Sequence, residues 1–189
     1  MRRQERIIGM GQDVDEGIAQ ADHIERGHDS TLPAARTVPA VANPAPVMDA
    51  SALEAFLSAA FPGRPTTMRV GRIDADLLTL HLPTGTADLR PGGTISGPTL
   101  MTLADTASYL RIVASVGPEA LAVTTSLTMQ FLKRPHPGDL VASATWLSLG
   151  RRLAVVDVQI HSEAPGKERL VAAAQVTYAR ALPDGTQGG

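Results

Sequence analysis

An acidic residue stands inside a largely apolar, helix-like stretch, and it is the strongest sign of chemistry in this sequence. The stretch is SGPTLMTLADTASYLRIVASVGP, residues 96–118, and the acidic residue is Asp105. On a helix, its neighbours three and four positions away are Met101, Thr102, Ser108 and Tyr109. None of them is cationic, and an unpaired carboxylate in apolar surroundings costs free energy. Asp105 therefore has either a functional role or a plain structural one, facing solvent or bonding to a neighbouring hydroxyl.

Two groups on this stretch could together promote attack on a carbonyl carbon. Asp105 could be a nucleophile or a general base, because an ordinary carboxylate is ionised at pH 7. Gly97 lies where the helix begins, and an N–H group at a helix N-terminus stabilises negative charge on a carbonyl oxygen. Gly97 could equally be no more than a cap residue before Pro98.

The spacing of these two residues predicts a dimer. Eight positions of helix separate Gly97 from Asp105, a rise of about 12 Å. Both groups must come within roughly 3 Å of one reacting group, which a single helix cannot achieve. Two copies with antiparallel helices would place Gly97 of one subunit beside Asp105 of the other, giving two equivalent sites.

The elements around this helix are one shorter helix and six strands. MDASALEAFLSAAFPG, residues 48–63, predicts a helix with Asp49 or Ser51 as its N-cap. The long helix begins with Ser96 or Gly97 as its cap and ends at Gly117. Strands are predicted over 66–73, 76–82, 121–132, 139–149, 152–162 and 168–181. This order predicts an α+β fold in which a curved antiparallel sheet wraps around the long helix.

The strand over residues 121–132 shows the cleanest alternation in the chain. Its period of two places Val123, Leu127 and Met129 on one face and Thr124 on the other, polar face. Thr124 is thus either an ordinary strand residue or a member of the site.

The composition excludes several classes of function. There are no cysteines, and the five histidines lack metal-binding spacing, so we expect no metal site. The whole chain has 17 Lys and Arg and 19 Asp and Glu, of which the first 47 residues hold five and seven, so residues 48–189 carry 12 of each sign and are neutral. A neutral domain with few aromatic rings argues against nucleic-acid binding. No apolar run of about 18 residues occurs, so we expect no membrane span and a cytoplasmic protein.

The chain is predicted to hold one domain between two tails. Residues 1–47 form a flexible leader, because four prolines interrupt any regular element in its second half. The domain covers residues 48–182, and residues 183–189 form a disordered C-terminal tail.

The order of elements, with SGPTLMTLADTA on the helix and AVTTSLTMQFLKRPHPGDLVASA after it, resembles hotdog-fold thioesterases of the phenylacetic acid degradation (PaaI-like) branch. The likeness covers about residues 48–182. The family's helix motif is roughly HGG, several apolar residues and then (L/A)AD(T/S)A. Here Gly97 and LADTA are kept, whereas Ser96 stands for the His, Pro98 for the second Gly, and Arg90 for an Asn of the preceding loop.

The resemblance implies hydrolysis of acyl-CoA thioesters by dimers, or dimers of dimers, with the site at the subunit interface. It implies that Asp105 is the nucleophile or general base, that the Gly97 N–H polarises the carbonyl, and that Thr124 assists Asp105 or water. No cofactor is expected beyond the coenzyme A of the substrate. The positions expected to contact the substrate are Arg90 and Ser96 from the motif, with Lys133, Arg134 and Arg151 near the coenzyme A phosphates. The last three could instead be ordinary solvated turn charges.

Two other functions compete with hydrolysis. The first is a hotdog module that binds an acyl-CoA without turning it over, which the changes at Arg90 and Ser96 favour. An isolated carboxylate on the helix argues against it, since a pocket for an apolar chain has no use for one. The second is a hydratase or dehydratase, but SGPTLMTLADTA lacks the Asp/His pair that this reaction needs.

Overall fold

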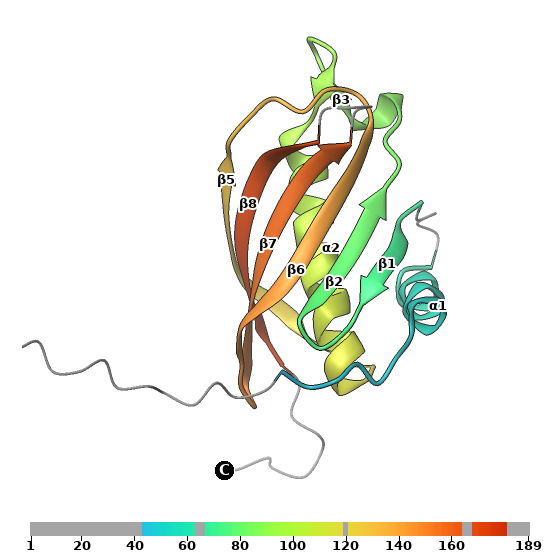
Figure 1. Ribbon diagram of the computed structural model, residues 1–189, viewed down its shortest axis with the longest axis vertical. Helices are drawn as coiled ribbons and strands as arrows, with labels where there is room; N and C mark the ends of the chain where they lie inside the picture. Colours follow the sequence, from blue (N-terminus) through green and yellow to red (C-terminus); the bar gives the residue numbers. More distant parts are fainter. Residues whose placement is uncertain (1–42, 63–66, 119–120, 164–167, 181–189) are drawn as a thin grey trace, which may run out of the picture. The chain divides into compact units, whose positions relative to one another are not determined.

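A computed structural model describes residues 43–62, 67–118, 121–163 and 168–180 as a curved antiparallel sheet wrapped around one long helix (Figure 1). The sheet has six strands in the order β1-β2-β6-β7-β8-β5. Their bounds, in chain order, are β1 Arg69–Ile73, β2 Leu77–Leu82, β5 Val123–Phe131, β6 Asp139–Leu149, β7 Leu153–Glu163 and β8 Arg169–Ala179. The predicted α+β architecture is confirmed.

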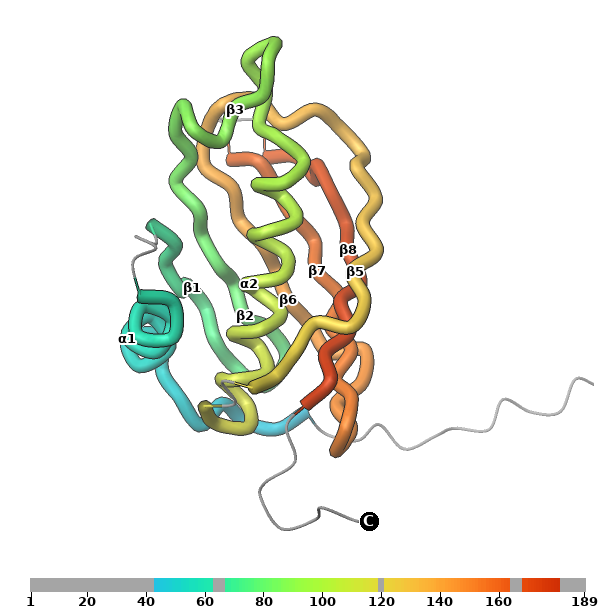
Figure 2. The backbone as a smooth tube through the Cα atoms, turned by 180° about the vertical axis from the view of Figure 1, so that it is seen from behind, coloured from blue at the N-terminus to red at the C-terminus, as the bar shows by residue number. Residues whose placement is uncertain are grey.

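The long helix α2 (Gly97–Val116) lies across the concave face of this sheet (Figure 2). Every residue from 107 to 115 is buried, as expected for a helix that the sheet surrounds on most sides. Ser96 is the N-cap, and Gly117 ends the helix with a φ of 91°, a conformation that favours glycine. Both helix ends therefore agree with the sequence prediction.

The short helix α1 (Ala50–Ala60) lies beyond the β1 edge of the sheet (Figure 2). The Asp49 carboxylate caps it by accepting a hydrogen bond from the Ala52 N–H at 2.8 Å. Leu53 and Leu57 are its buried face, and the Glu54 carboxylate accepts a 2.8 Å hydrogen bond from the Val70 N–H of β1. This bond fixes α1 against the sheet.

One prediction about the strand facing was wrong, because β5 contains a bulge. Thr124 pairs with Tyr178, but the next pairing joins Ser126 to Thr177, so Thr125 is an extra residue. The bulge changes the side-chain parity, and Thr124 turns toward α2 together with Leu127 instead of facing away from it.

The segment between β2 and α2, for which no helix or strand was predicted, also contains regular structure. A 3-10 turn η1 (Thr86–Asp88) leads into a small hairpin of β3 (Leu89–Arg90) and β4 (Thr94–Ile95). The turn of that hairpin uses Gly92 and Gly93, whose φ angles of 100° and 72° suit glycine.

Most of the predicted leader and the whole C-terminal tail lie outside the described residues, so the predicted domain limits stay a prediction. Of the leader, residues 43–47 are described, and the Val47 N–H donates a 2.7 Å hydrogen bond to the Ala114 carbonyl of α2. Asn43 donates to the Asp76 carboxylate at 3.2 Å. Neither described helix is long and apolar enough to cross a membrane.

Candidate active site

The carboxylate of Asp105 is held by two hydroxyl groups from the sheet. Thr124 of β5 donates to its Oδ1 at 2.8 Å, and the Tyr178 hydroxyl of β8 donates to the same oxygen at 2.7 Å. The Tyr178 hydroxyl also lies 3.1 Å from the Asp105 carbonyl oxygen. Asp105 is half-buried, so hydroxyl donors rather than a cation offset part of its desolvation.

The phenol of Tyr178 remains a donor over the whole working pH range. Burial raises its pKa far above the ordinary value, and the hydrogen bond to the Asp105 carboxylate adds to the rise. Tyr178 was not predicted as a site residue, because a tyrosine in a strand is usually a core residue. Only the register of β8 against β5 places Tyr178 opposite Thr124, and the sequence alone does not give that register.

A pocket of about 320 Å³ opens beside Asp105, and three aromatic rings, those of Phe61, Tyr109 and Tyr178, form part of its wall. The Tyr109 ring lies 6.0 Å from Tyr178 in a stacked arrangement and 6.3 Å from Phe61 edge-on. Phe61, at the end of α1, is 45% exposed although its ring lines this pocket. The carboxylate thus borders an apolar space that is open to solvent and large enough for a small acyl group.

The start of α2 presents one free backbone N–H group. Pro98 has no N–H, the Thr99 N–H donates to Ser96 Oγ at 3.3 Å, and the Leu100 N–H donates to the Ser96 carbonyl at 3.4 Å. In the described part of the chain, the Gly97 N–H has no acceptor within hydrogen-bond distance. It is therefore available to a ligand, as the first N–H groups of a helix are.

A second pocket, of about 350 Å³, lies at Gly97 and carries positive charge. Arg90, Lys133 and Arg134 line it, and Thr94 fixes the Arg90 side chain by accepting a 2.8 Å hydrogen bond from Nε. A Cβ on Gly97 would lie 3.5 Å from the Phe131 ring, so this glycine sits close to the pocket's apolar wall. Cations around a free N–H suit an anionic, phosphate-bearing ligand.

The predicted site residues thus divide between two places. Asp105 and Thr124 meet at the aromatic pocket, whereas Gly97, Arg90, Lys133 and Arg134 meet at the cationic pocket. Two predicted residues line neither pocket. Ser96 is the N-cap of α2, and Arg151 lies exposed in the β6–β7 turn. A single subunit does not bring Asp105 and Gly97 to one reacting group.

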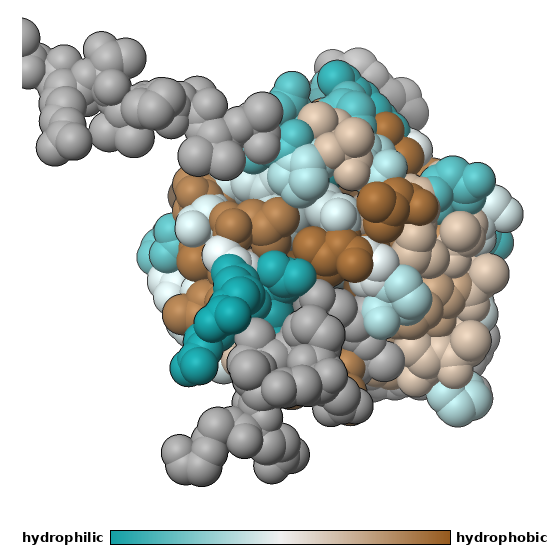
Figure 3. Space-filling view, turned by 90° about the horizontal axis from the view of Figure 1, so that it is seen from below, coloured by the Kyte–Doolittle hydropathy of each residue, from teal (hydrophilic) through white to brown (hydrophobic). Residues whose placement is uncertain are grey.

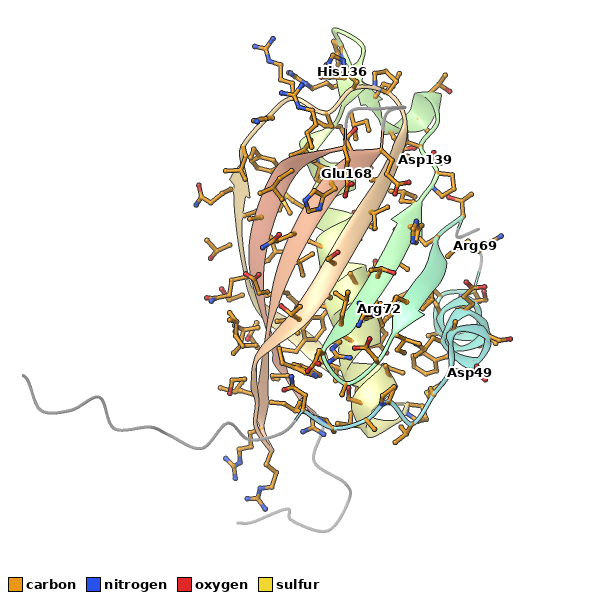
Figure 4. The ribbon with its side chains drawn as sticks, in the orientation of Figure 1. Asp49, Arg69, Arg72, His136, Asp139 and Glu168 are labelled. Carbon is orange, nitrogen blue, oxygen red and sulfur yellow. The ribbon has the colours of Figure 1, made fainter. Side chains whose placement is uncertain are left out.

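Other ionisable side chains do not gather into a metal centre. In the ranges that the structure describes, no three His, Asp or Glu residues are close enough to hold a metal ion. Figure 4 shows the labelled ionisable residues spread over the molecule instead, with Arg69 and Arg72 on β1, His136 in the loop before β6 and Asp139 at the start of β6.

One cation on α2 is buried, and the sequence analysis overlooked it. Arg111 is fully buried and donates to the carbonyls of Asp74, at 2.7 Å, and of Ala75, while its guanidinium lies 5.2 Å from the Trp146 ring centroid. Burial lowers the pKa of Arg111, and the Asp74 and Asp76 carboxylates oppose that shift. Its donors face the β1–β2 turn and not Asp105.

Comparisons with known proteins identify the family of this chain. The model of the thioesterase superfamily matches residues 92–169. A candidate thioesterase of Silicibacter sp. TM1040 is 36% identical, with 72% of this chain and 94% of that chain covered and a TM-score of 0.65.

More distant structures share the fold. Thioesterase HI1161 of Haemophilus influenzae is 18% identical, with 74% of this chain and 95% of that chain covered and a TM-score of 0.64. The E. coli PaaI protein of the phenylacetic acid degradation operon is 23% identical, with 60% and 79% covered and a TM-score of 0.54. None of the curated proteins matches the chain.

Proposed function

The chain belongs to the thioesterase superfamily and is a thioester hydrolase, and on that premise we propose that it hydrolyses an acyl-CoA to the free acid and coenzyme A at a site shared by two subunits. The observation that carries this proposal is the Asp105 carboxylate, held by two hydroxyls at the mouth of an aromatic pocket. A pocket that only bound an acyl chain would gain nothing from a half-buried negative charge.

The reaction needs one attacking group and one donor for the carbonyl oxygen. Asp105 either attacks the thioester carbon itself or takes a proton from the water that does. The carbonyl oxygen becomes negative as the new bond forms, and the Gly97 N–H with the dipole of α2 stabilises it. The C–S bond then breaks, and the coenzyme A sulfur leaves and takes up a proton. Where water attacked, the acid is released at once; where Asp105 attacked, water hydrolyses the acyl–Asp105 anhydride, which releases the acid and restores the carboxylate.

The surface of α2 supports the sharing of the site between two subunits. Pro98, Met101 and Thr102 are exposed and Asp105 is half-buried, so one strip of the helix is left uncovered by its own sheet. Met101 is 43% exposed and stands midway between Gly97 and Asp105. A twofold axis at Met101 would place Gly97 of one antiparallel helix beside Asp105 of the other.

The edge strand β5 adds apolar surface next to this strip. Several large side chains at β5 and its ends are half-exposed or more: Leu121, Val123, Phe131 and Leu132. Apolar side chains also reach the surface at the lower end of the molecule (Figure 3). An exposed strand edge and an apolar strip favour association with a second copy, as a dimer or a dimer of dimers.

In such a dimer the two pockets have complementary roles. The aromatic pocket at Asp105 of one subunit receives the acyl group, which is apolar. The cationic pocket at Gly97 of the other subunit receives the phosphates of coenzyme A through Arg90, Lys133 and Arg134. The thioester joins these two parts of the substrate and therefore lies between Asp105 and Gly97.

The variant Asp105→Asn tests the proposal, with release of free thiol measured on a panel of aromatic, short, medium and long acyl-CoAs. Asn keeps the shape of Asp, and its carbonyl oxygen can still accept hydrogen bonds from Thr124 and Tyr178. We expect kcat to fall by about 10²- to 10⁴-fold, the usual share of a positioned acid or base. Thermal unfolding of the same variant should change little.

Two outcomes would contradict hydrolysis by Asp105. Wild-type turnover by Asp105→Asn, with a lower melting temperature, would make the residue structural. Tight binding of a non-hydrolysable acyl-CoA analogue by the wild-type protein, without turnover of any acyl-CoA, would favour the binding module.

A further inference from the structure

Two hydroxyl groups hold the same oxygen of the Asp105 carboxylate and leave the other free. Thr124 and Tyr178 both donate to Oδ1, while Oδ2 has no hydrogen-bond partner among the described residues. We propose that Tyr178, together with Thr124, positions the carboxylate so that Oδ2 is the oxygen that attacks or takes the proton. This inference rests on the proposed hydrolysis and assigns Tyr178 a positioning role, not a catalytic one.

The fold fixes both donors in place. Thr124 and Tyr178 are directly paired across β5 and β8, so their side chains lie next to each other on the same face of the sheet. The bulge at Thr125 is what turns Thr124 inward, because without it Thr124 and Leu127 would face opposite sides. A bulge beside a site that re-aims one side chain is a recurrent device in enzymes.

The ring of Tyr178 is immobilised by its surroundings. Tyr178 is buried, with 3% of its surface exposed, and stacks on Tyr109 at 6.0 Å. Its hydroxyl reaches both the carboxylate and the backbone carbonyl of Asp105. A rigid donor of this kind limits the carboxylate to one orientation, which is the main requirement for a group that must meet a reacting atom closely.

The phenol is suited to hold the carboxylate but not to exchange protons with it. Burial and the Asp105 carboxylate raise its pKa far above neutrality, so it stays protonated throughout the reaction. Because both donors bond to Oδ1, the lone pairs of Oδ2 are left for the reacting group. Both forms of the mechanism, nucleophile and general base, use that same oxygen.

The test compares variants that each remove one hydroxyl. Tyr178→Phe keeps the ring and its stacking on Tyr109, and Thr124→Val keeps the shape of the side chain, with Thr124→Ser as the variant that retains the hydroxyl. We expect each loss to lower kcat about 10-fold at nearly constant KM, the double loss to lower it about 100-fold or more, and Thr124→Ser to stay near wild type. Thr128→Val is the matched control, because Thr128 is exposed on the same strand outside the bulge and pairs with Gln175, far from Asp105 in the register.

A second comparison shows whether Tyr178 acts through Asp105. In the Asp105→Asn background, the residual thiol release should be the same with Tyr178 and with Phe at that position, since there is no longer a carboxylate to position. An equal fall in both backgrounds would overturn the inference, because Tyr178 would then act on the substrate directly. Wild-type kcat in both Tyr178→Phe and Thr124→Val, with only lower melting temperatures, would overturn it as well and leave the hydroxyls as a clamp between helix and sheet.

These results separate the inference from the proposed function. If Asp105→Asn itself retains full kcat, the proposed function fails. If Asp105→Asn is inactive while Tyr178→Phe and Thr124→Val turn over normally, the function stands and the positioning role fails.

Discussion

Two inactive variants of this chain should restore activity when they are combined in one dimer. If each site takes Asp105 from one subunit and Gly97 from the other, a dimer of one Asp105→Asn subunit and one Gly97→Pro subunit has one intact site. Its second site carries both substitutions. The alternative, a site completed within one subunit, leaves a defect in both sites of the mixed dimer.

The choice of proline at position 97 follows from the local backbone. Ser96 has φ −77° and ψ 152°, the extended conformation that a residue before proline adopts. Gly97 is the first residue of α2, where proline is favoured because its missing N–H is unpaired in any case. Gly97→Pro therefore removes the free N–H at a helix position that accepts proline.

The expected magnitude follows from this count of sites. Loss of one donor for the carbonyl oxygen should lower kcat of the Gly97→Pro parent by about 10²- to 10³-fold. The mixed dimer should recover about half of the wild-type kcat per dimer, since one site of two is intact. The matched variant Gly97→Ala keeps the N–H and adds a Cβ at an ordinary 3.5 Å from the Phe131 ring, so its loss should be far smaller than that of Gly97→Pro.

The assay uses co-expression of the two variants with different tags, isolation of the mixed dimer, and thiol release from a hydrolysed acyl-CoA. Sedimentation of the same sample confirms that the mixed species is a dimer. A mixed dimer no more active than its parents would refute the shared site. A stable wild-type monomer with full activity at micromolar concentration would refute it too.

Two further predictions concern the rest of the domain. Arg111→Ala, which leaves a gap beside Trp146, should lower the free energy of unfolding by about 2–5 kcal/mol, the usual cost of truncating a large buried side chain, whereas Arg111→Met should cost far less. Urea unfolding followed by the fluorescence of Trp146, the one tryptophan of the chain, measures both. Equal stability of Arg111→Ala and wild type would contradict the packing role. Deletion of residues 1–42 should leave thiol release and melting temperature unchanged. Deletion of residues 1–47 should lower the melting temperature, because it removes the hydrogen bond from Val47 to Ala114. A large fall in activity or melting temperature from the shorter deletion would show that the leader supports the domain.

The sequence predicted the helices and long strands because their signals are local. Caps, glycine stops and alternating apolar residues lie within a few positions of each element, so Asp49, Ser96 and Gly117 could be recognised before any tertiary contact was known. The facing of β5 could not be predicted, because a bulge depends on how the strand pairs with its neighbour. The face predicted for Thr124 was wrong for that reason.

Residues of the candidate site could be proposed most directly from the sequence where one element carries them, and their catalytic roles stay predictions. Asp105 and Gly97 lie on one helix with a recognisable pattern, and the structure places Thr124 against Asp105. Tyr178 was missed because it follows Asp105 by 73 positions and reaches it only through the sheet register. The β3–β4 hairpin was missed because strands of two residues have no periodicity to detect.

The partners of Asp105 are neutral hydroxyl groups and not a cation, and this explains how the carboxylate can be both half-buried and reactive. The helix also carries a buried cation, but Arg111 lies six positions further on, about 9 Å along the axis and about 120° around it. Its Nη1 and Nη2 donate to the carbonyls of Asp74 and Ala75, so the two charges do not form an ion pair. A direct ion pair would draw the carboxylate's electron density toward a cation and cover the oxygen needed for attack. Neutral hydroxyls on one oxygen reduce the cost of burial while the net negative charge and the second oxygen remain available. Introducing a lysine at Thr124 or Tyr178 would supply the missing cation, and on this reasoning it would remove activity even if the protein folded.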